Sequence, residues 1–451
     1  MTVTAVLVQW WSLTAMAALL GAVVLDVAIL PQTAREVIAA RKRLGRWITV
    51  CAVMLLLASG ASLMVRATTM AGGRLDLAVA VLPRILARTH FGPIWIARLV
   101  AIVAFLVVWP LRFRLARLIG LALTLGIALT TSLTGHAADW GAITVRVFSD
   151  WIHVVSSAVW VGGLFGLAAI VLRSARDWPR QIISGVAARF SKLAGVCLVI
   201  VVLAGAYNSW IQIPFVSTLW TTAYGRVLLG KIAIVVIVIA FGAFNRFTIV
   251  PALDGWRGTG LGYRIFRLAR YMAGRRGKSP AGTLPRRFAV YVGREAVLGV
   301  AVFACSAILT ESTPPRHEAH LRQTATSREP YRLTMEELHR HGGIPKGWVF
   351  RPAEGDPDRG RDVFVKLECF SCHAVQGESF PRPSRPGPDL SGMGRHHPAG
   401  YLAESVMNPN AVIVEGPGYT GPDRLSTMPD YRDNLTLGEL DDLVAYLKSL
   451  E

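Results

Sequence analysis

Cysteine is scarce in this chain, which contains five cysteines in 451 residues. Three of them stand singly within apolar runs, where a cysteine side chain packs as a small hydrophobe: Cys51, Cys197 and Cys305. The other two, Cys369 and Cys372, form a C-x-x-C pair. A zinc site on this pair would need two more ligands, and no other cysteine occurs beyond position 305 to supply them.

Acidic residues are also few, and their distribution along the chain is uneven. The sequence holds 29 Asp and Glu against 48 Lys and Arg, a formal net charge of +19. Residues 345–451 carry 11 basic and 16 acidic residues, so the basic excess belongs to the preceding part. Because that part consists of apolar runs, a nucleic-acid partner is not expected. Its apolar runs contain no paired carboxylates, which leaves no evidence of an ion path.

The first 311 residues are dominated by apolar runs of about 20 residues, enough to cross a hydrocarbon core of roughly 30 Å. Eight spans are predicted, at residues 5–30, 47–65, 93–111, 115–133, 150–172, 190–212, 227–250 and 295–311. The stretch 77–88 is apolar on one side and too short to span, so we expect it at the membrane interface.

The sequence therefore predicts an all-α fold with the lipid bilayer as its first partner. Residues 1–311 form a polytopic membrane helix bundle of about eight transmembrane helices, by the span lengths above. Residues 312–344 are polar and punctuated by Pro and Gly, as in a linker. Residues 345–451 form a small helical C-terminal domain.

Basic residues gather in alternate connections of the predicted bundle, at 41–46, 112–117, 173–180 and 257–287. By the positive-inside rule these connections face the cytoplasm, which places both termini on the outer side of a bacterial cytoplasmic membrane. The first span has no basic residue before it and is predicted to be a retained helix, not a cleaved leader. For the last of these connections, a phosphate-binding face is the alternative.

A haem-attachment motif, C-x-x-C-H, stands at Cys369, Cys372 and His373. The two thiols would add across the haem vinyl groups, and the adjacent imidazole would bind the iron from one side. The second axial ligand should come from later in the chain, and Met428 is the best candidate because a thioether raises the reduction potential. Competing donors are Met393, Met407, His396 and His397. One covalent haem c is expected.

Residues 345–451 resemble a class I cytochrome c. The segments that carry the resemblance occur in the expected order: GRDVFVKLECFSCH, GPDL, the MP loop and TLGELDDLVAYL. The resemblance implies the same roles for Cys369, Cys372, His373 and Met428, and it adds Pro388 as support for the proximal histidine. It also implies that the first and last helices cross at Gly360, Phe364 and Tyr446.

Three histidines lie at the predicted outer ends of the spans. His90 precedes the third span, His136 follows the fourth, and His153 lies about one turn into the fifth. Asp150 stands on the same helix face as His153, where it could accept an imidazole N–H. Imidazole binds both copper and haem iron, so a copper site and a b-type haem remain open, as does interfacial packing without metal. Soft donors for Cu(I) could come from Met64 and Met70.

Residues 1–310 resemble the copper-resistance D family of membrane proteins. The resemblance rests on THFGPIWIAR, GHAADW, HVVSSAVWVGGL, RFSKLAG and TTAYGRVLLGKIAIVVIVIAFGAFNR, in this order. It implies copper binding or copper transport, with His90, His136 and His153 as the outer ligands. The C-terminal cytochrome departs from the family pattern.

Three functions remain open for the whole chain. The first is electron transfer at the outer face of the membrane linked to copper binding or transport, with a periplasmic or membrane redox partner. The second is an electron relay through a b-type haem in the bundle. The third is an anchoring subunit of a respiratory complex. In each case the chain is expected to be an electron carrier or a transport and redox subunit more than a stand-alone enzyme.

The topology yields a direct prediction. An alkaline phosphatase, which folds only outside the cytoplasm, should be active when it is fused after Glu451. The same enzyme fused after Arg114, in a basic connection, should be inactive. Enzyme activity in whole cells measures both fusions, and the reverse pattern would show that the C-terminal domain lies inside.

Overall fold

The computed structural model covers the chain and describes residues 2–312, 331–336 and 355–450 with some gaps. The gaps within these ranges are residues 33, 72, 139–142, 172, 174–177, 214, 251–283, 415, 417, 418, 422, 423 and 433. The basic connection predicted at 257–287 lies outside the described residues except for its last four. Most of the predicted linker 312–344 also lies outside them.

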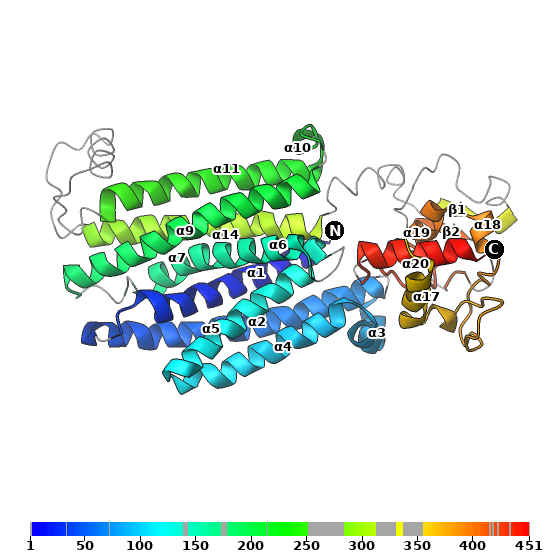
Figure 1. Cartoon of the computed structure of the whole chain (residues 1–451), viewed down its shortest axis with the longest axis horizontal. Coiled ribbons are helices and arrows are strands. Elements are labelled where there is room, and N and C mark those ends of the chain that lie inside the picture. Colours follow the sequence, from blue (N-terminus) through cyan, green and yellow to red (C-terminus); the bar gives the residue numbers. More distant parts are fainter. Residues whose placement is uncertain are drawn as a thin grey trace. The chain divides into compact units, whose positions relative to one another are not determined.

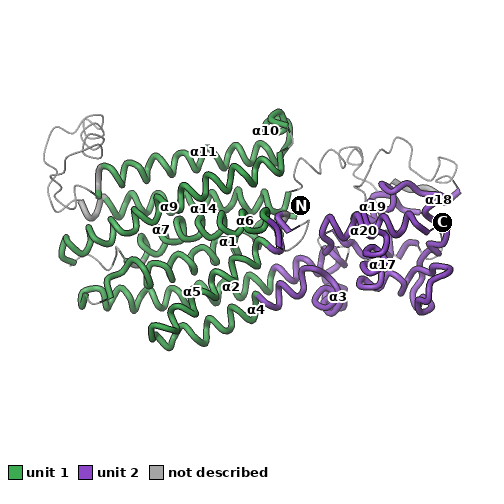
Figure 2. Tube along the Cα trace, in the orientation of Figure 1, with its two compact units in different colours: residues 1–61, 98–132, 145–315 green, residues 62–97, 133–144, 316–451 purple. Residues whose placement is uncertain are grey.

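The described residues form two compact units, which Figure 2 shows in different colours. Unit 1 contains residues 1–61, 98–132 and 145–315, and unit 2 contains residues 62–97, 133–144 and 316–451. The division falls inside α2 (Ile38–Met70) and α4 (Phe91–Val108) and at the end of α5 (Arg114–Leu133). Parts of three membrane helices therefore belong to the same unit as the C-terminal domain.

Eight helices in the described part of the chain are long and apolar enough to cross a membrane, which confirms the predicted number. They are Val3–Ile29, Arg35–Met70, Phe91–Leu111, Arg114–Leu133, Val145–Ala169, Arg180–Gln212, Ala223–Phe247 and Phe288–Glu311. Each overlaps one predicted span, and several are longer. A hydropathy pattern marks only the part in hydrocarbon, whereas the hydrogen-bonded helix continues into polar sequence at either end.

The helices of unit 1 are drawn in Figure 1. Besides parts of α2, α4 and α5, they are η2 (Arg35–Val37), η3 (Trp109–Leu111), α1 (Val3–Val24), α6 (Val145–Ser157), α7 (Gly163–Gly166), α9 (Arg180–Gln212), α10 (Thr218–Thr221), α11 (Ala223–Phe244) and α14 (Leu284–Glu311). Four stretches are π-helical: η1 (Leu25–Ile29), η5 (Ala158–Gly162), η6 (Leu167–Val171) and η7 (Asn245–Ile249). Such stretches are rare and frequently lie at functional sites.

Helix α1 is the most enclosed span of unit 1. It is apolar on all sides and packs on η5, α7 and α14. Its contact with η5 is close, because a Cβ at Gly162 would lie 1.8 Å from the carbonyl oxygen of Ala17. A Cβ at Gly21 would likewise lie 2.2 Å from the backbone of Gly162. Small residues let membrane helices approach to backbone contact, and here they fix α1 against η5.

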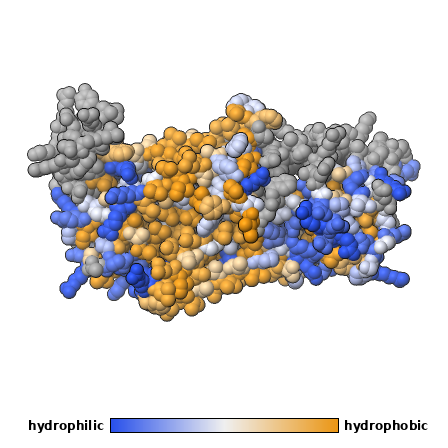
Figure 3. All heavy atoms as spheres, viewed as in Figure 1, coloured by the Kyte–Doolittle hydropathy of each residue, from blue (hydrophilic) through white to orange (hydrophobic). Residues whose placement is uncertain are grey.

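The surface of the helix bundle in unit 1 is largely apolar, as Figure 3 shows. Helices α9 and α11 expose large aliphatic side chains there, including Val196, Val199, Leu203, Val236 and Ile237. Exposed apolar surface of this extent is typical of contact with lipid. The chain is therefore a membrane protein.

One carboxylate joins two of the predicted cytoplasmic connections. Asp26 in η1 is 4% exposed, and it pairs with Arg41 at 2.9 Å and with Arg117 at 3.5 Å. These arginines belong to the basic stretches 41–46 and 112–117. Two guanidinium groups satisfy a buried carboxylate whose isolation would be costly. The three groups hold the ends of three spans at one level of unit 1.

The C-terminal part of unit 2 is a small helical domain. Its elements are α17 (Pro357–Lys366), η9 (Cys369–Ser371), α18 (Met393–His396), α19 (Ala399–Met407), β2 (Val412–Val414) and α20 (Leu437–Ser449). Strand β1 (Tyr331–Leu333), within the predicted linker, pairs in parallel with β2. Helix α20 begins with a capping box formed by Thr436 and Glu439, which fixes its first turn.

The first and last helices of this domain cross as predicted. A Cβ at Gly360 in α17 would lie 1.9 Å from the carbonyl oxygen of Asp442 in α20, so the two backbones touch. One turn further, the rings of Phe364 and Tyr446 pack edge to face with centroids 5.4 Å apart. The crossing fixes the position of α17, and the C-x-x-C-H segment follows α17 in the chain.

Candidate functional site

The C-x-x-C-H segment follows directly from the end of α17. Glu368 adopts a left-handed conformation with φ of 57°, and the chain then enters the short helical turn η9. The amide of His373 donates to the carbonyl of Cys369 at 3.0 Å, which keeps Cys369, Cys372 and His373 within one turn. Both cysteines are free thiols, as thioether bonds to a haem require.

The ring of His373 has a fixed orientation. Its Nδ1 lies 2.9 Å from the carbonyl oxygen of Pro388, and a carbonyl can only accept, so Nδ1 carries the proton. Within the described part of the chain Nε2 has no hydrogen-bond partner. Burial lowers the pKa of His373, which favours the neutral imidazole that a metal needs. The ring thus presents one unprotonated nitrogen.

The surroundings of the motif fit a haem. Val363, Leu367 and Tyr431 belong to the buried apolar cluster of unit 2, and Cys369 and Met428 pack against it. Thiols, a neutral imidazole and a thioether beside an apolar wall form the donor set of a c-type haem with His and Met ligands. The cytochrome c domain reported below implies this covalent haem, and the axial roles of His373 and Met428 remain predictions.

The competing donors differ from Met428 in their contacts or in the element that carries them. Met407 packs against the same apolar cluster. His397 is buried and stacks on Tyr401 with ring centroids 4.9 Å apart. Met393 begins the short helix α18, in which His396 is exposed. Met428 differs from these because it lies in an irregular loop, where its amide donates to Ser426 Oγ at 3.2 Å.

A second element of unit 2 reaches the motif, and no sequence pattern indicated this contact. Helix α3 (Leu75–Arg88) corresponds to the stretch predicted to lie at the membrane interface. Arg88 forms an ion pair with Glu368 at 2.8 Å, and Arg84 approaches the same carboxylate at 3.9 Å. Ala78 and Ile85 of this helix belong to the apolar cluster of unit 2. Part of its apolar surface therefore packs on protein, while Leu75, Leu77 and Val79 are exposed.

Arg84 is the more buried of the two arginines. Its side chain is 16% exposed, against 45% for Arg88. Burial raises the pKa of Cys369 to about 12, and the positive charge of Arg84 acts in the opposite direction on that thiol. Arg84 also lies near Tyr431, whose pKa is raised mainly by burial. A cation therefore lies directly beside the haem-attachment segment.

The outer histidines fall in both units. His90 Nε2 lies 3.2 Å from the carbonyl oxygen of Leu133, and His153 Nδ1 lies 3.1 Å from that of Val201. His136 is in η4 (His136–Ala138), and its side chain is outside the described residues. Among the described residues no group of three His, Cys, Asp or Glu forms a metal site. The three-histidine site thus remains a prediction.

The immediate partners of His153 differ from those expected. Its Nδ1 faces a backbone carbonyl, and Asp150 Oδ1 accepts a hydrogen bond from Asn208 Nδ2 at 3.3 Å. Lys231 lies near both Asp150 and His153. Of the soft donors, Met70 is buried in the apolar cluster of unit 2 and Met64 is exposed. Packing therefore explains Met70.

The two units define a class: a polytopic membrane helix bundle that carries a c-type cytochrome domain. Known families match in the same order along the chain. Copper resistance protein D-like, N-terminal domain, matches residues 1–145; Copper resistance protein D matches residues 184–309; Cytochrome c matches residues 357–451. No solved structure matches the chain.

Relatives cover the bundle. Copper resistance protein D of Pseudomonas syringae pv. tomato is 32% identical over 225 residues, which are 48% of this chain and 73% of the relative. Inner membrane protein YebZ of Escherichia coli is 28% identical over 226 residues, 49% of this chain and 76% of that protein. Copper transport protein CutJ of Bacillus subtilis is 32% identical over 123 residues, 27% of this chain and 22% of that protein. The chain belongs to the copper resistance protein D family and ends in a cytochrome c domain.

The assignment of the distal ligand can be tested. Met428→Ala should leave the haem covalently attached, because both cysteines remain, but it should change the ligand field and lower the reduction potential. Visible absorption and potentiometric titration measure both effects. Met407→Ala is the matched control and should keep the parent spectrum. An unchanged spectrum in Met428→Ala would transfer the role to another donor.

The charge of Arg84 should tune the haem. A nearby cation favours the reduced, less positive haem, so Arg84→Gln should lower the reduction potential by an amount on the order of tens of millivolts. Arg88→Gln removes an equal charge that pairs with the same carboxylate. Because the side chain of Arg88 is more exposed and is screened by solvent, this variant should change the reduction potential by a smaller amount. Equal shifts in potentiometric titrations of the two variants would show that only the pairing with Glu368 matters.

Proposed function

We propose that this protein is a membrane-anchored c-type cytochrome that transfers electrons at the outer face of a bacterial cytoplasmic membrane, in connection with copper binding or transport. The observation that carries the proposal is the union, in one chain, of a copper resistance protein D bundle with a cytochrome c domain. Cu(I) and Cu(II) prefer different ligands, so an electron carrier that changes the oxidation state of copper would change how the copper is bound.

Residues of unit 2 would hold the haem. Cys369 and Cys372 would anchor it, and His373 Nε2 and Met428 would bind the iron. When bound, the haem supplies one-electron transfer at a potential set by its ligands and surroundings. The carbonyl of Pro388 fixes the tautomer and orientation of the His373 ring.

His90 and His153 are the proposed copper ligands that the structure describes, with His136 as the third. Ligating histidines usually donate their second ring N–H to a carbonyl or carboxylate. Both described rings have such a carbonyl, from Leu133 and Val201, and each keeps its other nitrogen for a metal. The same arrangement suits haem iron, so the metal has to be identified by experiment.

The orientation with the cytochrome outside is supported by the basic connections. The carboxylate of Asp26 joins arginines from two of them, at 41–46 and 112–117, so both lie at one end of unit 1. Clustered basic residues are retained in the cytoplasm. The relative from Escherichia coli is named as an inner membrane protein. The proposed redox partner is accordingly a periplasmic protein or a membrane protein with an outer face.

Metal and haem content test the proposal. The protein purified in mild detergent should contain one covalent haem c and bound copper, and His153→Ala should lose copper while it keeps the haem. His339→Ala, in the predicted linker, is the control and should keep both. Elemental analysis and the pyridine haemochrome spectrum measure the two contents. A non-covalent b-type haem that disappears in His153→Ala would instead indicate an electron relay. Unchanged haem and copper contents in His153→Ala would indicate that the bundle is only an anchor.

A further inference from the structure

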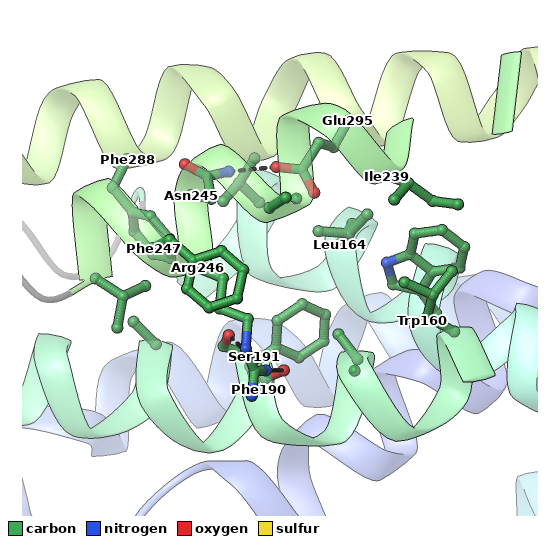
Figure 4. A pocket seen from close by; sticks show the side chains of 18 residues that line it. Trp160, Leu164, Phe190, Ser191, Ile239, Asn245, Arg246, Phe247, Phe288 and Glu295 are labelled. Carbon is green, nitrogen blue, oxygen red and sulfur yellow. Dashed lines mark hydrogen bonds between the residues drawn. The ribbon is translucent and has the colours of Figure 1, made fainter. Parts of the chain in front are cut away.

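Unit 1 contains a cavity that the proposed function does not use. It has a volume of about 350 Å³ and is lined by residues of η5, α7, α9, α11, η7 and α14 (Figure 4). This volume lies within the range of small-molecule sites, roughly 300–1,000 Å³. Most of its wall is apolar, and four flat rings contribute to it: Trp160, Phe190, Phe247 and Phe288.

Two polar side chains from different helices meet in this wall. Glu295 of α14 is 3% exposed and Asn245 of η7 is 6% exposed. The Asn245 Nδ2 group donates to Glu295 Oε1 (Figure 4). A buried ionisable residue inside a membrane helix is expensive, and it usually marks a functional site.

Each of these side chains keeps one oxygen without a partner. Asn245 Oδ1 is buried and has no hydrogen bond. Glu295 Oε2 makes no hydrogen bond in the described residues, and a Cβ added at Gly242 would lie 3.6 Å from it. An unsatisfied buried acceptor costs about 1–3 kcal/mol, so a molecule that donates to both oxygens would be favoured.

The only neighbouring cation along η7 is directed elsewhere. Arg246 follows Asn245, and its guanidinium donates to the carbonyl oxygen of Ser191 in α9. In Figure 4 it points away from Glu295. The π-helical turn of η7 places these two consecutive residues on separate contacts, so the carboxylate is left facing the cavity without a counter-ion from Arg246.

The two acceptors do not form a cation site. Hard cations take six or more oxygen ligands, whereas this wall offers one carboxylate and one amide oxygen. No group of three His, Cys, Asp or Glu approaches it among the described residues. Ser191 and Arg246 also line the cavity but bond to each other, and the remaining wall is aromatic, aliphatic or glycine. A ligand that fits this wall is a largely apolar molecule with hydrogen-bond donors at one end.

We propose that this cavity binds a lipid-soluble hydroquinone. Its ring would pack on the aromatic side chains, and its hydroxyl groups would donate to Asn245 Oδ1 and Glu295 Oε2. A flat ring suits the four aromatic residues better than the single chain of a fatty alcohol does, because aromatic groups pack favourably face to edge or offset. The surface of the helix bundle in unit 1 is largely apolar, so such a ligand would reach the cavity from the bilayer. Binding requires neither the haem nor the outer histidines.

The test uses the full-length protein and a methylated benzohydroquinone with a decyl tail. Native mass spectrometry from detergent should show one bound hydroquinone per chain. The corresponding dimethyl ether, which has the same ring and no donors, should bind to the parent protein at least about tenfold more weakly. The hydroquinone should also bind to Glu295→Gln at least about tenfold more weakly than to the parent protein. Haem content and copper content should stay at the parent level in this variant, which separates the result from the proposed function.

A matched pair of glycine variants controls for folding. Both glycines are in α11: a Cβ at Gly242 meets only Glu295 Oε2 within 4 Å, and a Cβ at Gly230 meets nothing within 4 Å. Gly242→Leu should abolish binding, and Gly230→Leu should bind as the parent does. Equal binding by the ether, or undiminished binding by Gly242→Leu, would overturn the proposal. A phospholipid retained by the parent and lost from Gly242→Leu would also overturn it, by assigning the cavity to a structural lipid.

Discussion

The cost of leaving a polar group unpaired in hydrocarbon determines the arrangement of this protein. Where unit 1 buries a carboxylate, it supplies partners: Asp26 has two arginines, and Glu295 has the amide of Asn245. His153 has a backbone carbonyl. Among the buried polar atoms of unit 1 that have no partner in the described chain, Asn245 Oδ1 is the one that lies in the cavity wall, and Glu295 Oε2 beside it makes no hydrogen bond there.

The sequence was sufficient for the features that depend on local pattern. Hydropathy identified all eight spans, since each needs a continuous apolar run. The C-x-x-C-H motif and the closing helix identified the cytochrome c domain, because haem attachment requires contiguous residues. The crossing at Gly360 followed from resemblance, and the structure explains it by direct backbone contact.

Features that depend on distant partners could not be predicted in the same way. The apolar side of α3 is equally compatible with a lipid surface and with a protein surface, so its sequence could not reveal the contact with Glu368. Glu295 stood at the very edge of a predicted span, and its pairing with Asn245 depends on a π-helical turn that no sequence pattern specifies. Strand β1 is three residues long and gains its conformation from pairing with β2.

The partly buried position of Cys369 against the apolar cluster has a consequence for the maturation of the protein. Burial raises the pKa of this thiol to about 12, so it is protonated at neutral pH, and thiols react with disulfides and oxidants through the thiolate. The thiol of the folded chain is therefore a poor reactant toward oxidants in a disulfide-forming compartment. The same packing disfavours its reaction with a haem vinyl group, so we expect haem attachment to be easier before α3 and the apolar cluster pack against this segment.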